Sequence, residues 1–190
     1  MTLGFMQKWP KEMGMQDDKT YFIEKINLGL LKSKQSKAID YVDALEDYRS
    51  KFGSNWDTKE NLKPKIHTIR KDESERWKPG MNIHFVVNSR SSNRFKFSPV
   101  VKCASVQTIE IINAENYGIG DPKVSYSGKI NISGFDWFFG LIVKIDGRTL
   151  SKKEVESLAV NDGFESVWEF FLYFQQDFKG RLIHWTNLRY

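Results

Sequence analysis

The sequence predicts an α+β fold with a single hydrophobic core. A chain of 190 residues is long enough for one domain with a sizeable core. Aromatic residues make up 14% of the chain, a content typical of packed proteins and not of disordered ones. Segments that alternate as strands do lie between segments with the three-to-four-residue spacing of helices. We therefore expect one domain spanning residues 1–190, with a mixed set of strands and flanking helices.

The first third of the chain predicts a strand followed by two helices. Residues 2–7 have strand character, and residues 21–31 show the helical spacing of apolar side chains. Residues 32–62 are more polar, and we interpret them as an insertion that contains a second helix over residues 38–52. The apolar stripe of this helix is expected to dock on the outside of the same protein. The stripe consists of Ala38, Tyr41, Val42, Leu45 and Tyr48.

The rest of the chain predicts further strands. Residues 81–88 alternate as a strand, and residues 95–112 predict two strands separated by a bend at Pro99. Strands are also predicted at residues 141–145 and 181–186, the latter closing the fold.

Two helices are expected between these last strands. Ser151 and Glu154 form a capping box at the start of the first, which is expected to end near Leu158. The second begins at residues 165–166 and carries an apolar stripe. That stripe consists of Val167, Phe170, Phe171 and Phe174.

Residues 114–133 predict a second, β-rich insertion. Glycine and proline residues separate two short strands at residues 123–127 and 129–132. Gly118 and Gly120 are not followed by a helix, so they do not fit a phosphate-binding loop.

The composition limits the range of functions. The net charge of +5 and the pI near 9.1 are common in proteins that bind nucleic acids or nucleotides. Cys103 is the single cysteine, which excludes an intramolecular disulfide, and its apolar neighbours predict a buried thiol. Lys8 and Pro10 interrupt the N-terminal segment, which does not resemble a signal peptide, and no apolar run is long enough to span a membrane. We expect a cytoplasmic protein without a membrane partner.

Residues 64–70 bring two cations, a hydroxyl and an imidazole into one short strand-like segment. In a strand, Thr68 and Arg70 point to the same face because successive side chains alternate. Lys65 can join them only if the chain turns or bulges after Pro64. An ordinary structural interpretation also remains open, in which Thr68 is a plain strand residue, Lys65 is solvated and Arg70 pairs with an acidic neighbour.

Other candidate ligand-binding residues are two arginines and a tryptophan. Arg90 and Arg94 lie in a basic loop that is either an ordinary hairpin tip or a phosphate-binding site. Trp77 is a candidate for base stacking and, alternatively, a core residue. The histidines lie in separate strand-like segments, so the sequence predicts neither a metal site nor a cofactor. They are His67, His84 and His184.

Three features, in their order along the chain, resemble the ASCH domains, a branch of the PUA-like superfamily. The first is the K-x-x-T-x-R pattern of Lys65, Thr68 and Arg70, which follows a strand and a helix. The second is Trp-Lys-Pro-Gly at residues 77–80, leading into a strand. The third is Ala-Val-Asn-Asp-Gly-Phe at residues 159–164, between two helices and before the closing strand. The resemblance covers most of the chain apart from the two insertions.

The resemblance implies a small PUA-like β-barrel with helices across its openings and a cleft lined by the K-x-x-T-x-R residues. The family is linked to RNA metabolism and modified nucleosides. Some small members hydrolyse the amide of N4-acetylcytidine with a lysine, a threonine and a glutamate. Lys65 and Thr68 match the first two, and Asp162, one methylene shorter, stands near the position of the glutamate.

Residue chemistry is compatible with such a reaction. A partly buried lysine beside an arginine loses its proton more readily and can act as a base. Lys65 would then activate Thr68 as a nucleophile, and Asp162 would exchange protons. Arg70 would orient a carbonyl, a carboxylate or a phosphate.

Three hypotheses follow from the sequence. The first is a module that binds RNA, single-stranded nucleic acid or a nucleotide in a basic cleft. The second is an amidohydrolase that removes an acyl group from a modified nucleoside such as N4-acetylcytidine. The third is a non-catalytic module whose inserted helix at residues 38–52 binds a protein partner of unknown identity.

Overall fold

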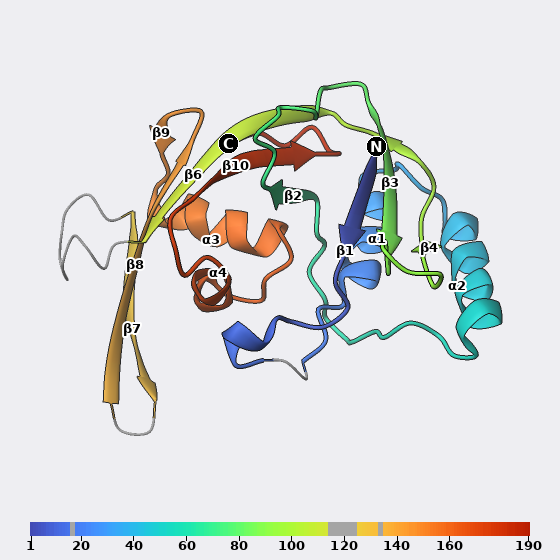
Figure 1. The fold of residues 1–190 in the computed structure, drawn as a ribbon, viewed down its shortest axis with the longest axis horizontal. Coiled ribbons are helices and arrows are strands. Elements are labelled where there is room, and N and C mark those ends of the chain that lie inside the picture. The colour runs from blue at the N-terminus through green and yellow to red at the C-terminus, as the bar shows by residue number, and fades with distance from the viewer. Residues whose placement is uncertain (16–17, 114–124, 133–134) are drawn as a thin grey trace.

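The protein folds into two β-sheets with helices packed against them, as a computed structural model shows (Figure 1). The structure describes residues 1–15, 18–113, 125–132 and 135–190. The predicted α+β class is confirmed. The expected closed barrel is not found among these residues, because the backbone pairing of their strands divides into two separate sheets instead of closing on itself.

The smaller sheet contains β1 (Thr2–Phe5), β3 (Asn82–Val87), β4 (Phe95–Lys96) and β5 (Val101–Lys102). β1 runs parallel to β3, and β4 and β5 pair with β3 antiparallel. A parallel pair needs a long crossover, which here contains two helices and a strand of the other sheet. The inward face predicted for residues 81–88 is confirmed, since Ile83, Phe85 and Val87 are all fully buried, although Val86 on the other face is fully buried as well.

The larger sheet follows the order β2 (His67–Arg70), β10 (Phe178–His184), β6 (Ser105–Asn113), β8 (Phe135–Ile145) and β7 (Tyr126–Ile132). β9 (Arg148–Thr149) pairs with β8. All neighbouring strands of the larger sheet are antiparallel. β7 and β8 form a long hairpin that projects from the body of the protein (Figure 1).

The second insertion differs from its prediction. β7 is one strand of seven residues rather than two short ones, because its pairing with β8 continues without interruption. β8 begins at Phe135, six residues before the predicted start. Residues 114–124, with Gly118 and Gly120, and residues 133–134 lie outside the described part of the chain.

The predicted helices are confirmed with small changes at their ends. They are α1 (Phe22–Lys32), α2 (Ala38–Phe52), α3 (Lys152–Asn161) and α4 (Val167–Tyr173). A short 3₁₀ helix, η1 (Lys11–Met13), follows β1. None of the helices in the described ranges is long and apolar enough to cross a membrane.

The docking face of α2 is rotated from the predicted stripe. Tyr48 is buried and contacts Phe95 at 5.2 Å between ring centroids, whereas Val42 is 45% exposed. The hydroxyl of Tyr41 donates a hydrogen bond to Glu24 at 2.9 Å. The large aromatic side chains therefore decide which face turns inward, and Ala38 turns outward with Val42.

The segment before β2 lies between α1 and the end of α3. The backbone N–H of Lys65 donates to Lys25 in α1 at 2.9 Å, and that of Ile66 donates to Asn161 in α3 at 2.9 Å. α3 ends in a reversal at Gly163, which has a φ of 95° that favours glycine. These contacts bring together two chain segments that are nearly 100 residues apart in sequence.

Candidate functional site

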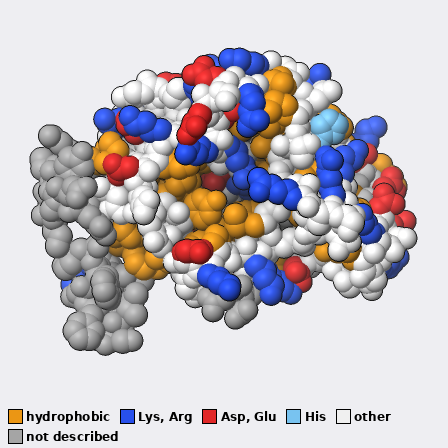
Figure 2. Space-filling model, in the orientation of Figure 1, with side chains coloured by type: hydrophobic (Ala, Val, Ile, Leu, Met, Phe, Trp, Pro, Cys, Tyr) orange, Lys and Arg blue, Asp and Glu red, His pale blue; other side chains and the backbone are white. Residues whose placement is uncertain are grey.

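Four polar residues that the sequence singled out line one small cavity. Thr68 and Arg70 are alternate residues of β2, and Lys65 comes from the irregular segment before that strand. The fourth, Asp162, is the residue that caps the C-terminus of α3. Figure 2 shows a hollow in this region, between α4 and β1, with hydrophobic side chains inside it and Lys and Arg side chains at its edge.

Lys65 and Asp162 form a buried ion pair. The Lys65 Nζ lies 2.8 Å from Asp162 Oδ1 and also donates to the Asp162 backbone carbonyl. Lys65 is 1% exposed, and its burial lowers the pKa of the ammonium from 10.5 to about 8 although Asp162 opposes this change. The positive charges of Arg70 and Lys25 lower that pKa further. With a pKa near 8, roughly a tenth of Lys65 is neutral at pH 7 and can accept a proton.

The two oxygens of the Asp162 carboxylate have different surroundings. Oδ1 accepts from Lys65 and from the backbone N–H of Ile69 at 3.1 Å, and it lies 3.5 Å from Nδ1 of His67. Burial would raise the pKa of this carboxyl, but Lys65 and His67 outweigh it and hold the pKa below its usual value. Asp162 is thus a carboxylate at neutral pH. No hydrogen bond to Oδ2 is found among the described residues, which leaves that oxygen available for a ligand or water.

Thr68 and Arg70 both contribute unused hydrogen-bonding capacity. Arg70 donates from one terminal nitrogen to the backbone carbonyl of Gly4 at 2.8 Å, and its guanidinium lies 4.9 Å from the ring centroid of Phe5. Its buried Nε has no partner among the described residues. The hydroxyl of Thr68 also makes no hydrogen bond within the described ranges. An unsatisfied buried donor costs about 1–3 kcal/mol, so the Arg70 Nε indicates a site for an acceptor.

Aromatic side chains form the wall of the cavity, and the sequence analysis did not identify them. Trp9 stacks on Phe164 with ring centroids 5.2 Å apart and planes 19° apart. Tyr173 also lines the cavity and is the most exposed of these aromatic residues, at 37%. The open volume is about 30 Å³, enough for one or two water molecules. A larger ligand must therefore displace a side chain, and Tyr173 is the least restrained by burial.

The other three predicted site residues lie away from this cavity. Trp77 is 6% exposed and belongs to the hydrophobic core, where its backbone N–H donates to Asp72 at 3.0 Å. Arg90 and Arg94 are exposed in the loop between β3 and β4, and Arg94 contacts Thr2 Oγ1 at 3.2 Å. The structure thus brings together four of the seven residues singled out in the sequence.

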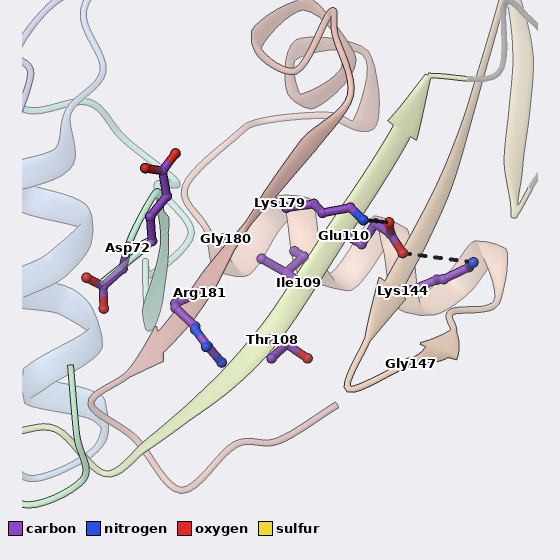
Figure 3. Close-up of a pocket in the computed structure, with 10 residues that line it drawn as sticks. Asp72, Thr108, Ile109, Glu110, Lys144, Gly147, Lys179, Gly180 and Arg181 are labelled. Carbon is purple, nitrogen blue, oxygen red and sulfur yellow. Dashed lines mark ion pairs between the residues drawn. The ribbon is translucent and has the colours of Figure 1, made fainter. Parts of the chain in front are cut away.

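A second pocket, of about 340 Å³, lies on the larger sheet (Figure 3). Lys144 and Lys179 approach Glu110 from opposite sides, with nitrogen–oxygen distances of 3.9 and 2.9 Å, and Arg181 pairs with Glu75. The lining of the pocket contains three acidic side chains, Asp72, Glu73 and Glu110, which balance the charge of these three cations. The pocket therefore lacks the excess positive charge expected of a site for a nucleic acid backbone.

The histidines do not form a metal centre in the described part of the chain, where no group of three or more candidate ligands is found. His67 and His184 pair across β2 and β10 and are completely buried. Burial lowers the pKa of His184 to about 3 and also lowers that of His67, so both rings are neutral at pH 7.

Lys25 is a second buried lysine beside the site, and it was missed. Its Nζ donates to the carbonyl of Gly163 at 2.7 Å, next to Asp162 in sequence. The sequence does contain a signal for its burial, because Lys25 lies between Phe22 and Ile26 on the apolar face of the predicted helix. A charge on such a face indicates a buried partner.

Comparisons of the chain with protein-family models, with curated proteins and with solved structures find no match. Arguments about function therefore rest on the geometry of this site.

Proposed function

We propose that this protein is a hydrolase that cleaves the amide of a small acylated nucleoside such as N4-acetylcytidine, and that it is a divergent ASCH protein with a PUA-like fold. One observation carries the proposal: a candidate base, a nucleophile, a carboxylate that balances the charge of the base, and an oxyanion donor converge on a single cavity. These are Lys65, Thr68, Asp162 and Arg70. The lowered pKa of Lys65 supports its role as the base.

In the first step, neutral Lys65 removes the hydroxyl proton of Thr68 while the threonine oxygen attacks the acyl carbon. The carbonyl π bond opens and gives a tetrahedral intermediate with a negatively charged oxygen. Arg70, which has an unused Nε–H, donates a hydrogen bond to that oxygen.

In the second step, the Lys65 ammonium returns the proton to the leaving nitrogen as the C–N bond breaks. The nucleoside amine departs, and the acyl group remains as an ester on Thr68. A water molecule, deprotonated by Lys65, then hydrolyses the ester to release the carboxylic acid and restore the threonine. Asp162 keeps the lysine in position and offsets its positive charge in both steps.

The size of the cavity favours a small acyl group. A volume of about 30 Å³ leaves no room for a nucleoside, so only the acyl end of the substrate reaches Thr68. The base then lies against the aromatic wall after Tyr173 moves. Stacking on an aromatic ring is worth roughly 1–3 kcal/mol per base.

The test is hydrolysis of N4-acetylcytidine and a panel of acylated nucleosides by the purified protein. Thr68→Val keeps the shape of the side chain but removes the nucleophile, so we expect it to lose activity by at least about 10²-fold. Thr68→Ser keeps the hydroxyl and serves as the matched control, and Lys65→Met removes the base. An acylated Thr68 in mass spectra of the quenched reaction would identify the intermediate. Absence of turnover in the native protein, or native rates for Thr68→Val, would refute the proposal.

A second function, binding of RNA or a nucleotide without turnover, is favoured by the unpartnered Nε of Arg70 in a chain of net charge +5. Phosphate contacts make affinity depend on salt. Affinity for a labelled single-stranded RNA should then fall with added salt and in Arg70→Ala. Undiminished binding by that variant would exclude this cavity as the binding site.

A further inference from the structure

His67 contacts the ion pair from outside the set of proposed catalytic residues. Its ring is completely buried, and Nδ1 lies 3.5 Å from Asp162 Oδ1 with no closer partner among the described residues. Its other nitrogen, Nε2, lies 2.9 Å from the hydroxyl of Tyr190. His67 therefore connects the Asp162 carboxylate to Tyr190, which lies 123 residues after His67 in the sequence.

The direction of the hydrogen bond between His67 and Tyr190 can be derived from a third residue. The side-chain amide of Asn161 donates to the Tyr190 hydroxyl at 2.9 Å, so this oxygen accepts there and has its own proton to donate. The acceptor within reach is Nε2 of His67, and a neutral imidazole that accepts at Nε2 carries its proton on Nδ1. The opposite tautomer would turn a lone pair toward the carboxylate and leave the tyrosine proton without an acceptor.

Tyr190 is held firmly enough to impose this direction. Its backbone N–H donates to Oε1 of Gln107 at 3.1 Å, and Nε2 of Gln107 donates to the Tyr190 carbonyl at 3.1 Å. Gln107 is in turn held by Asp146 at 2.9 Å. These contacts fix the backbone of Tyr190, and its ring lies against His67 and His184, with centroid distances of 5.5 and 6.2 Å.

We propose that His67 is a positioning residue, which Tyr190 and Asn161 hold in the neutral Nδ1–H tautomer so that this N–H fixes the Asp162 carboxylate against Lys65. The inference rests on the proposed function for its catalytic consequence. The tautomer of His67, and its dependence on Tyr190, can be measured whether or not the protein hydrolyses a substrate.

The charged and titratable groups around His67 agree with a neutral ring. Asp162 and Lys65 face it from the C-cap of α3 and from the irregular segment before β2. His184 faces it from β10 and Tyr190 from the segment after β10. His184 is uncharged at neutral pH, and burial raises the pKa of Tyr190, so the phenol keeps its proton.

The first test is ¹⁵N NMR of protein labelled at histidine, which distinguishes the two neutral tautomers. His84→Gln removes one signal and aids assignment of the remaining rings, which belong to His67 and His184. We expect His67 to carry its proton on Nδ1 across pH 6–9. We expect Tyr190→Phe, which keeps the ring but not the hydroxyl, to shift the Nε2 resonance or change the tautomer. An Nε2–H tautomer in the native protein, or no response to Tyr190→Phe, would overturn the proposal.

The second test uses a matched pair of substitutions. Asn carries a side-chain N–H near the place of Nδ1, whereas Leu has a similar size without a donor. Misplacement of a catalytic group reduces rates by roughly 10- to 100-fold, so kcat should fall by this much in His67→Leu and recover in His67→Asn. Equal activity of both variants with the native protein would contradict a positioning role. If the native protein shows no hydrolysis while the NMR result is as expected, the proposed function fails, and the assignment of the His67 tautomer to Tyr190 and Asn161 stands.

Discussion

Replacing Asp162 with asparagine tests the charge balance on which the site depends. Lys65 is the buried partner of this carboxylate, and its pKa of about 8 lies below the ordinary 10.5. At about 1.4 kcal/mol per pH unit, this lowered pKa costs the folded native protein about 3 kcal/mol at neutral pH. Without the carboxylate, the pKa of Lys65 falls further, and the lysine is neutral in the folded variant at pH 7.

The sign of the pH dependence follows from linkage. A lysine whose pKa is lowered by folding destabilises the fold most below its folded pKa, and the penalty declines as pH rises from that value toward the unfolded one. In the native protein, the loss of unfolding free energy caused by Lys65 is complete below about pH 8. In Asp162→Asn, this loss continues to increase as the pH falls further. The variant should therefore lose about 1–2 kcal/mol more than the native protein at pH 7 and about 2–3 kcal/mol more at pH 6, and this pH-dependent difference should vanish near pH 9.

Urea unfolding followed by tryptophan fluorescence at pH 6, 7, 8 and 9 measures this difference. Glu110→Gln is a suitable control because it removes a carboxylate whose lysine partners lie at the surface. Surface pairs contribute about 0–1 kcal/mol, and the control should show no trend over this range. A difference between Asp162→Asn and the native protein that is constant with pH, or that grows toward pH 9, would show that Lys65 does not titrate as a buried, counterion-dependent base.

Two further predictions concern the ends of α3. Gly163→Ala should lose about 2–4 kcal/mol in urea unfolding, because φ is 95° and the new Cβ would lie 2.8 Å from a ring carbon of Phe22. Gly147→Ala, at a φ of 82° with open space around it, should lose only about 1–2 kcal/mol, and equal losses would contradict the clash. Ser151→Ala removes the helix cap and should cost about 1 kcal/mol in the same assay. Ser157→Ala, on the exposed face of the same helix, should stay within about 0.5 kcal/mol, and a similar loss in both variants would argue against capping.

Local structure was largely predictable because its signals are local. The Ser151–Glu154 capping box is present in the structure, with α3 beginning at Lys152. The strand at residues 82–87 has the predicted inward face. The order of the strands was not predicted, because the pairing of β2 with β10 and of β10 with β6 depends on contacts between distant segments. The pattern of side chains alone did not reveal two sheets in place of a closed barrel.

The candidate site was likewise predictable only in its local features. Thr68 and Arg70, alternate residues of β2, both line the cavity, and Lys65 reaches it from an irregular segment at residues 62–66 and not from a regular turn. The sequence did not predict that Lys65 is paired and almost inaccessible, because its partner follows 97 residues later. His67 is completely buried and hydrogen-bonded to Tyr190. Its connection to Tyr190 carries no sequence signal, since only the folded chain brings these rings together.

The charges around the cavity constrain both proposed functions. Arg70, in the cavity, and Lys25, beside it, both lower the pKa of Lys65, while Asp162 is the carboxylate in contact with Lys65. Such an excess of positive charge stabilises an anion, whether it is the oxyanion of a tetrahedral intermediate or a bound phosphate. The two cases affect Lys65 differently. A resident phosphate would raise the lysine pKa toward its ordinary value and remove the neutral base, whereas an oxyanion exists only after Lys65 has taken its proton. Hydrolysis and stable phosphate binding therefore exclude each other at this cavity, and a phosphate carried by a substrate must lie outside it.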